Sequence, residues 1–288
     1  MSNTLDFPLA VSYASTETGR NPISWVLLVT GTLSIMGCIF NIAVTVRLGR
    51  AKLIIGKMVI TLAVFGLIKN IPSVFISFHA TTSRYTCETI GGWIQYFGNA
   101  SSLFFTTCFA HAYYHSLDDI ECIKKHYKKY LALSIISGVI LGSLSVILGF
   151  REHAYTSKGR SVCLVVRDSK FQWEISFILV TIAVVNIIGC ALYYIRIIKK
   201  LRSLHGELKW GLMLYPLFLI ICETPWVVRR IMLSFGFDFT SPVNYEINHA
   251  LLGLLGFFNS LAYGLSKEIY EALKRHCSSR SSEKNQNP

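Results

Sequence analysis

Two ionisable residues, Lys69 and Glu223, lie inside long apolar stretches of the sequence. A charge within a membrane-spanning helix is costly, so it faces the protein interior by default and marks a function or a specific charge pair. Each residue lies about 11 to 13 positions from the basic end of its stretch, which is about 16 to 20 Å along a helix. We therefore expect both near mid-depth, where they form an ion pair, bind a ligand separately or contact unrelated partners.

A second group of polar residues lies within the apolar stretch 91–114. Gln95, Asn99, Ser102 and Thr106 recur at spacings of four, three and four residues, which places them on one face of a helix. We expect this face to point into the protein. It then either binds a ligand or supplies hydrogen bonds between helices, worth about 0.6 kcal/mol each in a membrane. Both interpretations stay open at this point.

The composition of the chain indicates the class of protein in which these residues lie. The chain has 288 residues, of which 52% are hydrophobic and only 15% charged, and its mean hydropathy is +0.46. A soluble domain keeps about a quarter of its residues charged, so a soluble protein is excluded, as are a disordered chain, a collagen and a coiled coil. The composition therefore indicates an integral membrane protein.

Windows of about 19 residues identify the membrane-spanning segments. A barrel would show alternating segments of about ten residues instead of continuous apolar runs. We expect an all-α fold, an integral membrane bundle of seven transmembrane helices. The seven predicted spans are 23–46, 58–79, 91–114, 130–150, 173–195, 210–235 and 247–265.

Basic residues determine the predicted orientation, because they are retained on the cytoplasmic side of a membrane. One side is strongly enriched, so we expect the N-terminus outside and the C-terminus in the cytoplasm. The net charge of +12 then faces anionic lipid, which we favour over nucleic-acid binding. The enriched side carries Arg47, Arg50, Lys52, Lys57, Lys124, Lys125, Lys128, Lys129, Arg196, Lys199, Lys200, Arg202 and Lys209 in loops, and Lys267, Lys274, Arg275, Arg280 and Lys284 in the tail.

The chain divides into three predicted parts. Residues 1–22 form an extracellular N-terminal tail in which we identify no cleavable signal peptide, 23–265 form the transmembrane domain, and 266–288 form a cytoplasmic amphipathic helix and tail. Ile269, Leu273 and Cys277 recur at helical spacing in the last part, which is typical of a helix on a membrane surface. Cys277 is a candidate for palmitoylation.

Two of the eight cysteines, Cys87 and Cys163, fall on the predicted outer side. In an oxidising environment they either form one disulfide, which would hold the loop before the fifth span over the third span, or remain free thiols. No Cys or His cluster has the spacing of metal ligands. We therefore predict no metal and no cofactor.

Basic side chains also gather at the predicted outer mouth of the bundle. Arg229 and Arg230 lie about 19 and 20 residues above the cytoplasmic start of the sixth span. The loop before the fifth span contributes more cations, either as a solvated loop or as a funnel that attracts an anionic ligand. These cations are Arg151, Lys158, Arg160, Arg167 and Lys170.

Several short motifs follow one another in order between the second and seventh spans. They are Cys87, Gln95, Phe97 and Asn-Ala-Ser-Ser at 99–102, then Tyr-Pro-Leu at 215–217 and Arg230-Ile231, and finally Gly-Phe-Phe-Asn-Ser-Leu-Ala-Tyr-Gly-Leu at 256–265. This set resembles the cyclic-AMP-receptor-like family of seven-transmembrane G-protein-coupled receptors. The sequence departs from the family pattern at Phe105 and Glu223, where tryptophan is expected, and at Arg229, where asparagine is expected.

The resemblance implies a plasma-membrane receptor that transmits an extracellular small-molecule or peptide signal to a heterotrimeric G protein. Gln95, Asn99, Ser102, Lys69, Glu223, Arg229 and Arg230 are the predicted ligand-binding residues. Proline releases a backbone hydrogen bond and kinks a helix, so Pro216 is a predicted hinge of the sixth span. Asn259 and Tyr263 are predicted packing switches in the cytoplasmic half.

Other classes of protein compete with this prediction. An enzyme is not expected, because the sequence lacks a nucleophile elbow, a phosphate-cradling glycine loop and a metal-binding helix motif. A retinal pigment needs a Schiff-base lysine, and 247–265 contains none. A transporter or channel remains the alternative, with Lys69, Glu223 and His111 as an intramembrane relay. A receptor-like protein that no longer couples is a third possibility.

Overall fold

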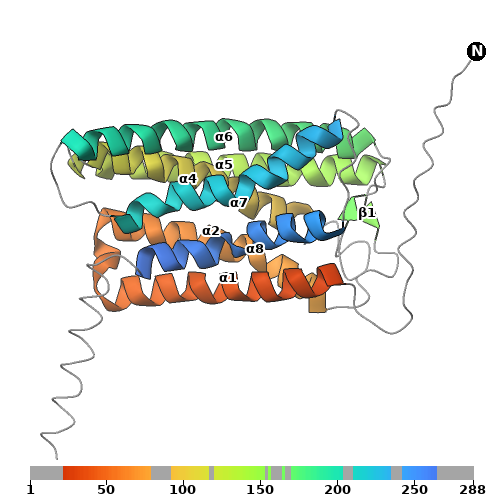
Figure 1. Cartoon of the computed structure of the whole chain (residues 1–288), viewed down its shortest axis with the longest axis horizontal. Helices are drawn as coiled ribbons and strands as arrows, with labels where there is room; N and C mark the ends of the chain where they lie inside the picture. Colours follow the sequence, from red (N-terminus) through yellow and green to blue (C-terminus); the bar gives the residue numbers. More distant parts are fainter. Residues whose placement is uncertain are drawn as a thin grey trace, which may run out of the picture.

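The computed structural model describes residues 22–78, 92–116, 120–152, 155–156, 164–165, 170–203, 210–234 and 242–264. Long helices account for nearly all of them (Figure 1). The helices are α1 (Pro22–Arg47), α2 (Ile54–Phe78), α4 (Gln95–Ser116), α5 (Ile120–Glu152), α6 (Lys170–Ser203), α7 (Trp210–Ser234) and α8 (Pro242–Gly264), with a short 3-10 helix η1 (Arg50–Lys52) between α1 and α2.

A short hairpin is the β structure in the described part of the chain. Strands β1 (Tyr155–Thr156) and β2 (Leu164–Val165) pair antiparallel, with Tyr155 opposite Val165. They connect α5 to α6 at one end of the bundle (Figure 1). At the other end α1, α4, α6 and α8 finish and α2, α5 and α7 begin. We call this second end the basic end, because Arg47, Lys57, Lys124 and Lys200 lie there.

Several helices are longer than the predicted spans. The fourth predicted span, 130–150, lies within α5, which begins ten residues earlier at Ile120. Lys124, Lys125, Lys128 and Lys129 therefore lie on a helix and not in a loop, which corrects the prediction. Hydropathy detects only the apolar part of a helix, whereas lysine is a good helix former and lets the helix continue into water. For the same reason α6 continues to Ser203, beyond the end of the predicted span 173–195.

The helices pack as a closed circuit. α1 contacts α2 and α8, α2 contacts α4, α6 contacts α7, and α7 contacts α8. α4 is central, because it also packs against α5, α6 and α7. In Figure 1 all of them run along the long axis of the molecule. A residue on the inward face of α4 is thus close to several helices at once.

Four of the described helices are long and apolar enough to cross a membrane by length and composition. The qualifying segments are Trp25–Arg47, Ile54–Phe75, Ile123–Ile147 and Phe177–Lys200. α4 falls short in apolarity because of polar residues such as Asn99, Ser102 and Thr106, and the last two are buried in the bundle. The predicted class, an all-α membrane protein, is therefore confirmed at this coarser level.

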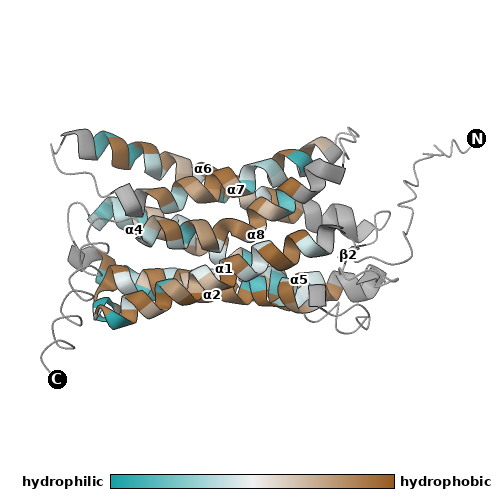
Figure 2. Cartoon of the chain, turned by 60° about the horizontal axis from the view of Figure 1, so that its bottom comes forward, coloured by the Kyte–Doolittle hydropathy of each residue, from teal (hydrophilic) through white to brown (hydrophobic). Residues whose placement is uncertain are grey.

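Many large hydrophobic side chains are exposed on the helices, and hydrophobic residues recur along the helices in Figure 2. Soluble proteins rarely expose contiguous apolar surface beyond a few hundred Å², whereas here large aliphatic and aromatic side chains are exposed along whole helices. Contact with lipid explains this surface. Examples are Val29, Met36 and Ile39 on α1, Ile136 and Ile140 on α5, and Phe177, Val185 and Ile188 on α6.

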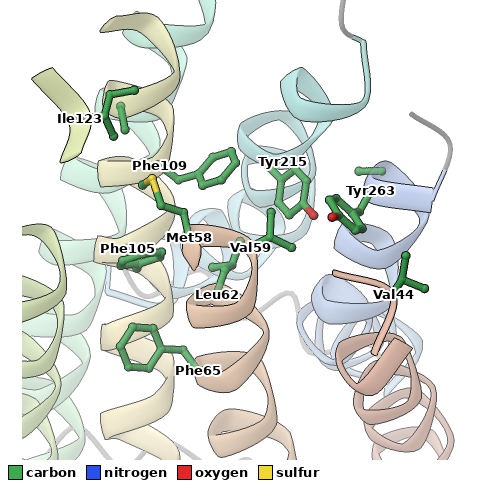
Figure 3. Packing of buried hydrophobic residues seen from close by; sticks show 12 residues of the cluster. Val44, Met58, Val59, Leu62, Phe65, Phe105, Phe109, Ile123, Tyr215 and Tyr263 are labelled. Atoms are coloured by element: carbon green, nitrogen blue, oxygen red, sulfur yellow. The ribbon is translucent and has the colours of Figure 1, made fainter. Parts of the chain in front are cut away.

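A buried hydrophobic cluster holds the helices together near the basic end (Figure 3). Phe105 of α4 is fully buried and contacts Phe65 of α2 edge to face, with ring centroids 5.7 Å apart. Phe109 of α4 packs against Tyr215 of α7 at 5.1 Å. Phe105 thus serves as a core residue between α2 and α4.

Candidate functional site

The two charged residues that the sequence places inside predicted spans form an ion pair. Lys69 Nζ of α2 lies 3.3 Å from Glu223 Oε1 of α7, and their side chains are 11% and 1% exposed. The predicted ion pair is therefore present. The second carboxylate oxygen, Glu223 Oε2, is buried and has no hydrogen-bond partner within the described residues. Because an unpaired buried charge is far costlier than a paired one, each residue depends on the other.

A glycine sets the position of Lys69. A Cβ atom at Gly98 of α4 would lie 2.6 Å from the backbone nitrogen of Lys69 and 2.8 Å from its Cα atom. Only a residue without a side chain allows this backbone approach between α4 and α2. The glycine thus brings the polar face of α4 next to the ion pair.

A polar cavity adjoins the ion pair. It is enclosed by α1, α2, α4, α7 and α8, and its wall combines amide, hydroxyl and ammonium groups with aliphatic ones. Asn70 Nδ2 is already engaged, since it donates to Ser34 Oγ at 3.0 Å and to the Gly66 carbonyl at 2.8 Å. We call the polar residues of its wall the polar strip: Asn41, Lys69, Asn70, Ser102, Tyr215 and Asn259.

The predicted polar face of α4 is divided among different contacts. Gln95 Nε2 donates to Ser73 Oγ of α2 at 3.3 Å, whereas Thr106 Oγ1 donates to the carbonyl of Ser102 in its own helix at 2.8 Å. Ser102 itself lines the cavity. Asn99 is half-buried, and its Oδ1 has no hydrogen-bond partner in the part of the chain that the structure describes. The face therefore contacts α2 through Gln95 and lines the cavity through Ser102, whereas Thr106 bonds within α4.

The predicted switch residues lie around the basic-end side of the cavity. Asn259 is part of its wall, and Tyr263 OH forms a hydrogen bond of 3.0 Å with Thr45 Oγ1 of α1. Pro216 lies inside α7, next to Tyr215. Asn259 is thus itself a member of the polar strip, and Tyr263 connects α8 to α1.

The other predicted site residues are distributed differently. His111 does not join the ion pair but lies in a separate cluster, where its Nδ1 is 2.7 Å from Tyr130 OH and its ring contacts His115 and Tyr193. The relay predicted from Lys69, Glu223 and His111 is therefore not assembled as one group. Arg229 lies half-buried on α7.

Several predictions lie outside the described residues. Cys87, Cys163 and Cys277 belong to this group, so the predicted disulfide and lipidation stay predictions. Arg230 is part of α7, but its side chain is not among those described, and the same holds for the cations of the loop before α6. Four other cysteines are free and buried: Cys38, Cys108, Cys190 and Cys222.

Sequence reasoning missed a contact between α4 and α6. Thr107 Oγ1 donates to Asn186 Oδ1 at 2.7 Å, and Asn186 Nδ2 donates to the carbonyl of Ile182 at 2.8 Å. Asn186 is 2% exposed. An asparagine inside an apolar run was the available signal, because a buried amide needs partners.

Replacing Thr107 by valine should lower the stability by about 1 kcal/mol, because the change keeps the shape but leaves Asn186 Oδ1 without its donor. The matched control is Thr181→Val, since Thr181 is exposed and its hydroxyl donates to the Phe177 carbonyl of its own helix. Thermal unfolding of both variants in lipid nanodiscs measures the difference. Equal losses would mean that the α4–α6 bond adds nothing.

No family model matches this sequence, and no curated protein matches it either. Among the described residues, no group of three or more His, Cys, Asp or Glu side chains is arranged to hold a metal ion. The fold and the site define the class directly: an all-helical membrane protein with a charge pair and a polar cavity inside its helix bundle.

Proposed function

We propose that this chain is a G-protein-coupled receptor of the cyclic-AMP-receptor-like type. In this proposal all seven long helices span the plasma membrane, with the N-terminus outside and the basic end in the cytoplasm. The observation that carries the proposal is the Lys69–Glu223 pair, which joins α2 to α7 inside a closed circuit of helices. Such a charge pair is a contact that a conformational change can make or break.

α7 is the element suited to move. It contains Pro216 and Pro225 on either side of Glu223, and each proline removes one backbone hydrogen bond within the helix. In the resting arrangement the ion pair and the polar strip hold α7 against α2 and α8. A ligand that binds the active arrangement more tightly shifts the population toward it. The basic end of α7 then moves and opens a surface for the G protein.

Because Glu223 stands where the family pattern has tryptophan, the ion pair is specific to this sequence and is not expected from the family pattern. The family pattern has tryptophan at that position, and a tryptophan cannot form an ion pair with Lys69. We infer that the charge pair here replaces apolar packing as the restraint on α7. Arg229, six residues further along α7, would then lie nearer the outer mouth and meet an anionic ligand.

The test is guanine-nucleotide exchange on a panel of Gα proteins, using membranes that contain the full chain and a set of anionic ligands that includes cyclic AMP. Exchange above that of empty membranes supports the receptor. Ligand-driven flux of ions or solutes into sealed vesicles, without exchange on any Gα, would instead support the transporter or channel. Ligand binding with neither response would indicate an uncoupled receptor-like protein.

Replacing Arg229 by alanine should reduce the potency of an active anionic ligand by about tenfold or more, which corresponds to about 1.4 kcal/mol. Arg229→Lys is the matched control, because it keeps the charge. The dose response of nucleotide exchange measures both variants, with surface expression checked in parallel. An unchanged response in Arg229→Ala would remove this residue from the ligand site.

A further inference from the structure

The cavity beside the ion pair is small and partly polar, and its occupant is a question separate from the proposed receptor mechanism. The volume open to the centre of a water-sized sphere is about 10 Å³, which is roughly what one water molecule needs. The cavity is thus too small for an organic ligand. Its wall contains six polar residues from five helices beside seven apolar ones.

Three residues of this wall each carry a buried polar atom without a hydrogen-bond partner within the described residues: Asn41 (Oδ1) of α1, Tyr215 (OH) of α7 and Asn259 (Oδ1) of α8. Their residues are 2%, 1% and 7% exposed. Buried polar groups are almost always hydrogen-bonded, to protein or to ordered water. A cavity lined by three residues that each carry such an atom offers room for a shared partner.

The chemistry of the wall selects that partner. Amide oxygens only accept hydrogen bonds, whereas a tyrosine hydroxyl can also donate one. The partner must therefore offer two donors to the amide oxygens, and it either accepts from or donates to the tyrosine hydroxyl. A cation would meet the Lys69 ammonium in the same wall, and an anion would meet two amide oxygens. A neutral water molecule avoids both repulsions.

We propose that this cavity is a binding site for one internal water molecule. The water donates to Asn41 Oδ1 and Asn259 Oδ1 and accepts a hydrogen bond from Tyr215. It therefore links α1, α7 and α8 through three atoms that have no direct hydrogen bond to one another. Figure 3 shows the Tyr215 hydroxyl directed toward that of Tyr263. The proposal does not depend on the receptor function.

The test compares two single-atom deletions by thermal unfolding in lipid nanodiscs. Tyr263→Phe is the matched reference, because the Tyr263 hydroxyl has a direct protein partner in Thr45. If water is bound, Tyr215→Phe lowers Tm by about 2–4 °C, as Tyr263→Phe does. If the cavity is dry, Tyr215→Phe removes an unpaired buried hydroxyl, and its Tm stays unchanged or rises while only Tyr263→Phe loses stability.

A second arm separates water from a cation. The Tm of the unaltered protein should be the same in sodium chloride and in choline chloride of equal concentration, whereas a sodium-dependent rise that disappears in Asn41→Leu would overturn the water assignment. A high-resolution cryo-electron microscopy map of the full chain gives the direct readout. A density peak within hydrogen-bonding distance of both amide oxygens supports the site, and a direct Asn41–Asn259 hydrogen bond overturns it.

Discussion

Replacing Glu223 by leucine, with Lys69 left in place, should destabilise the protein by about 3–5 kcal/mol, because it leaves an uncompensated buried charge. Lys69 is close to fully buried, and Glu223 Oε1 lies 3.3 Å from its ammonium group. Lys69→Met should have a similar effect, since it strands the carboxylate instead. Thermal or denaturant unfolding in lipid nanodiscs measures both losses.

The double variant Lys69→Met with Glu223→Leu gives the sharper result. Apolar residues of similar volume can replace a buried ion pair with little loss, or even with a gain, because both desolvation penalties disappear together. We therefore expect the double variant to be more stable than either single one. Losses that simply add would show that the two side chains are not coupled, contrary to the contact in the structure.

The same variants separate a structural role from a signalling role. If the ion pair only stabilises the bundle, the double variant regains stability and its basal nucleotide exchange stays at the level of the unaltered protein. If the pair restrains α7 in the resting state, the double variant is stable but shows raised basal exchange. The charge swap Lys69→Glu with Glu223→Lys should then bring basal exchange back down, because it restores a pair across the same two helices.

The sequence allowed this pair to be expected for a physical reason. The rise per residue of a helix is fixed, so the distance of Lys69 and Glu223 from the basic ends of their helices determined their depth. The periodicity of α4 likewise placed Gln95 and Ser102 on the inward face, where both are found in contact with α2 or the cavity. Depth and face are local properties of a helix.

The neighbours of each residue could not be derived in this way. His111 was grouped with the ion pair because it too lies inside a predicted span, yet the rotation of α4 and its packing against α5 and α6 place it against Tyr130 and Tyr193. The cavity wall was missed for the same reason. Asn41 and Asn70 lie in apolar runs, and only the order of helices around the bundle brings them beside Asn259.

Gly98→Ala should be a damaging substitution despite its small size, with an expected loss of about 1–3 kcal/mol. The added Cβ atom would lie 2.6 Å from the Lys69 backbone nitrogen, and backbone atoms cannot rotate away. Gly189→Ala is the matched control on α6, because its Cβ would meet Thr107 Cγ2 at 3.1 Å. That side chain can yield slightly, and alanine favours the helix by about 1 kcal/mol.

The damage at Gly98 should also be coupled to the ion pair. Pushing α4 away from α2 displaces the backbone that carries Lys69, so part of the loss comes from a poorer contact with Glu223. In the Lys69→Met, Glu223→Leu background that part is absent, and Gly98→Ala should cost less than in the unaltered chain. The unfolding free energies of the four proteins give this coupling directly. An equal cost in both backgrounds would show that the glycine serves helix packing alone and has no part in positioning the charge pair.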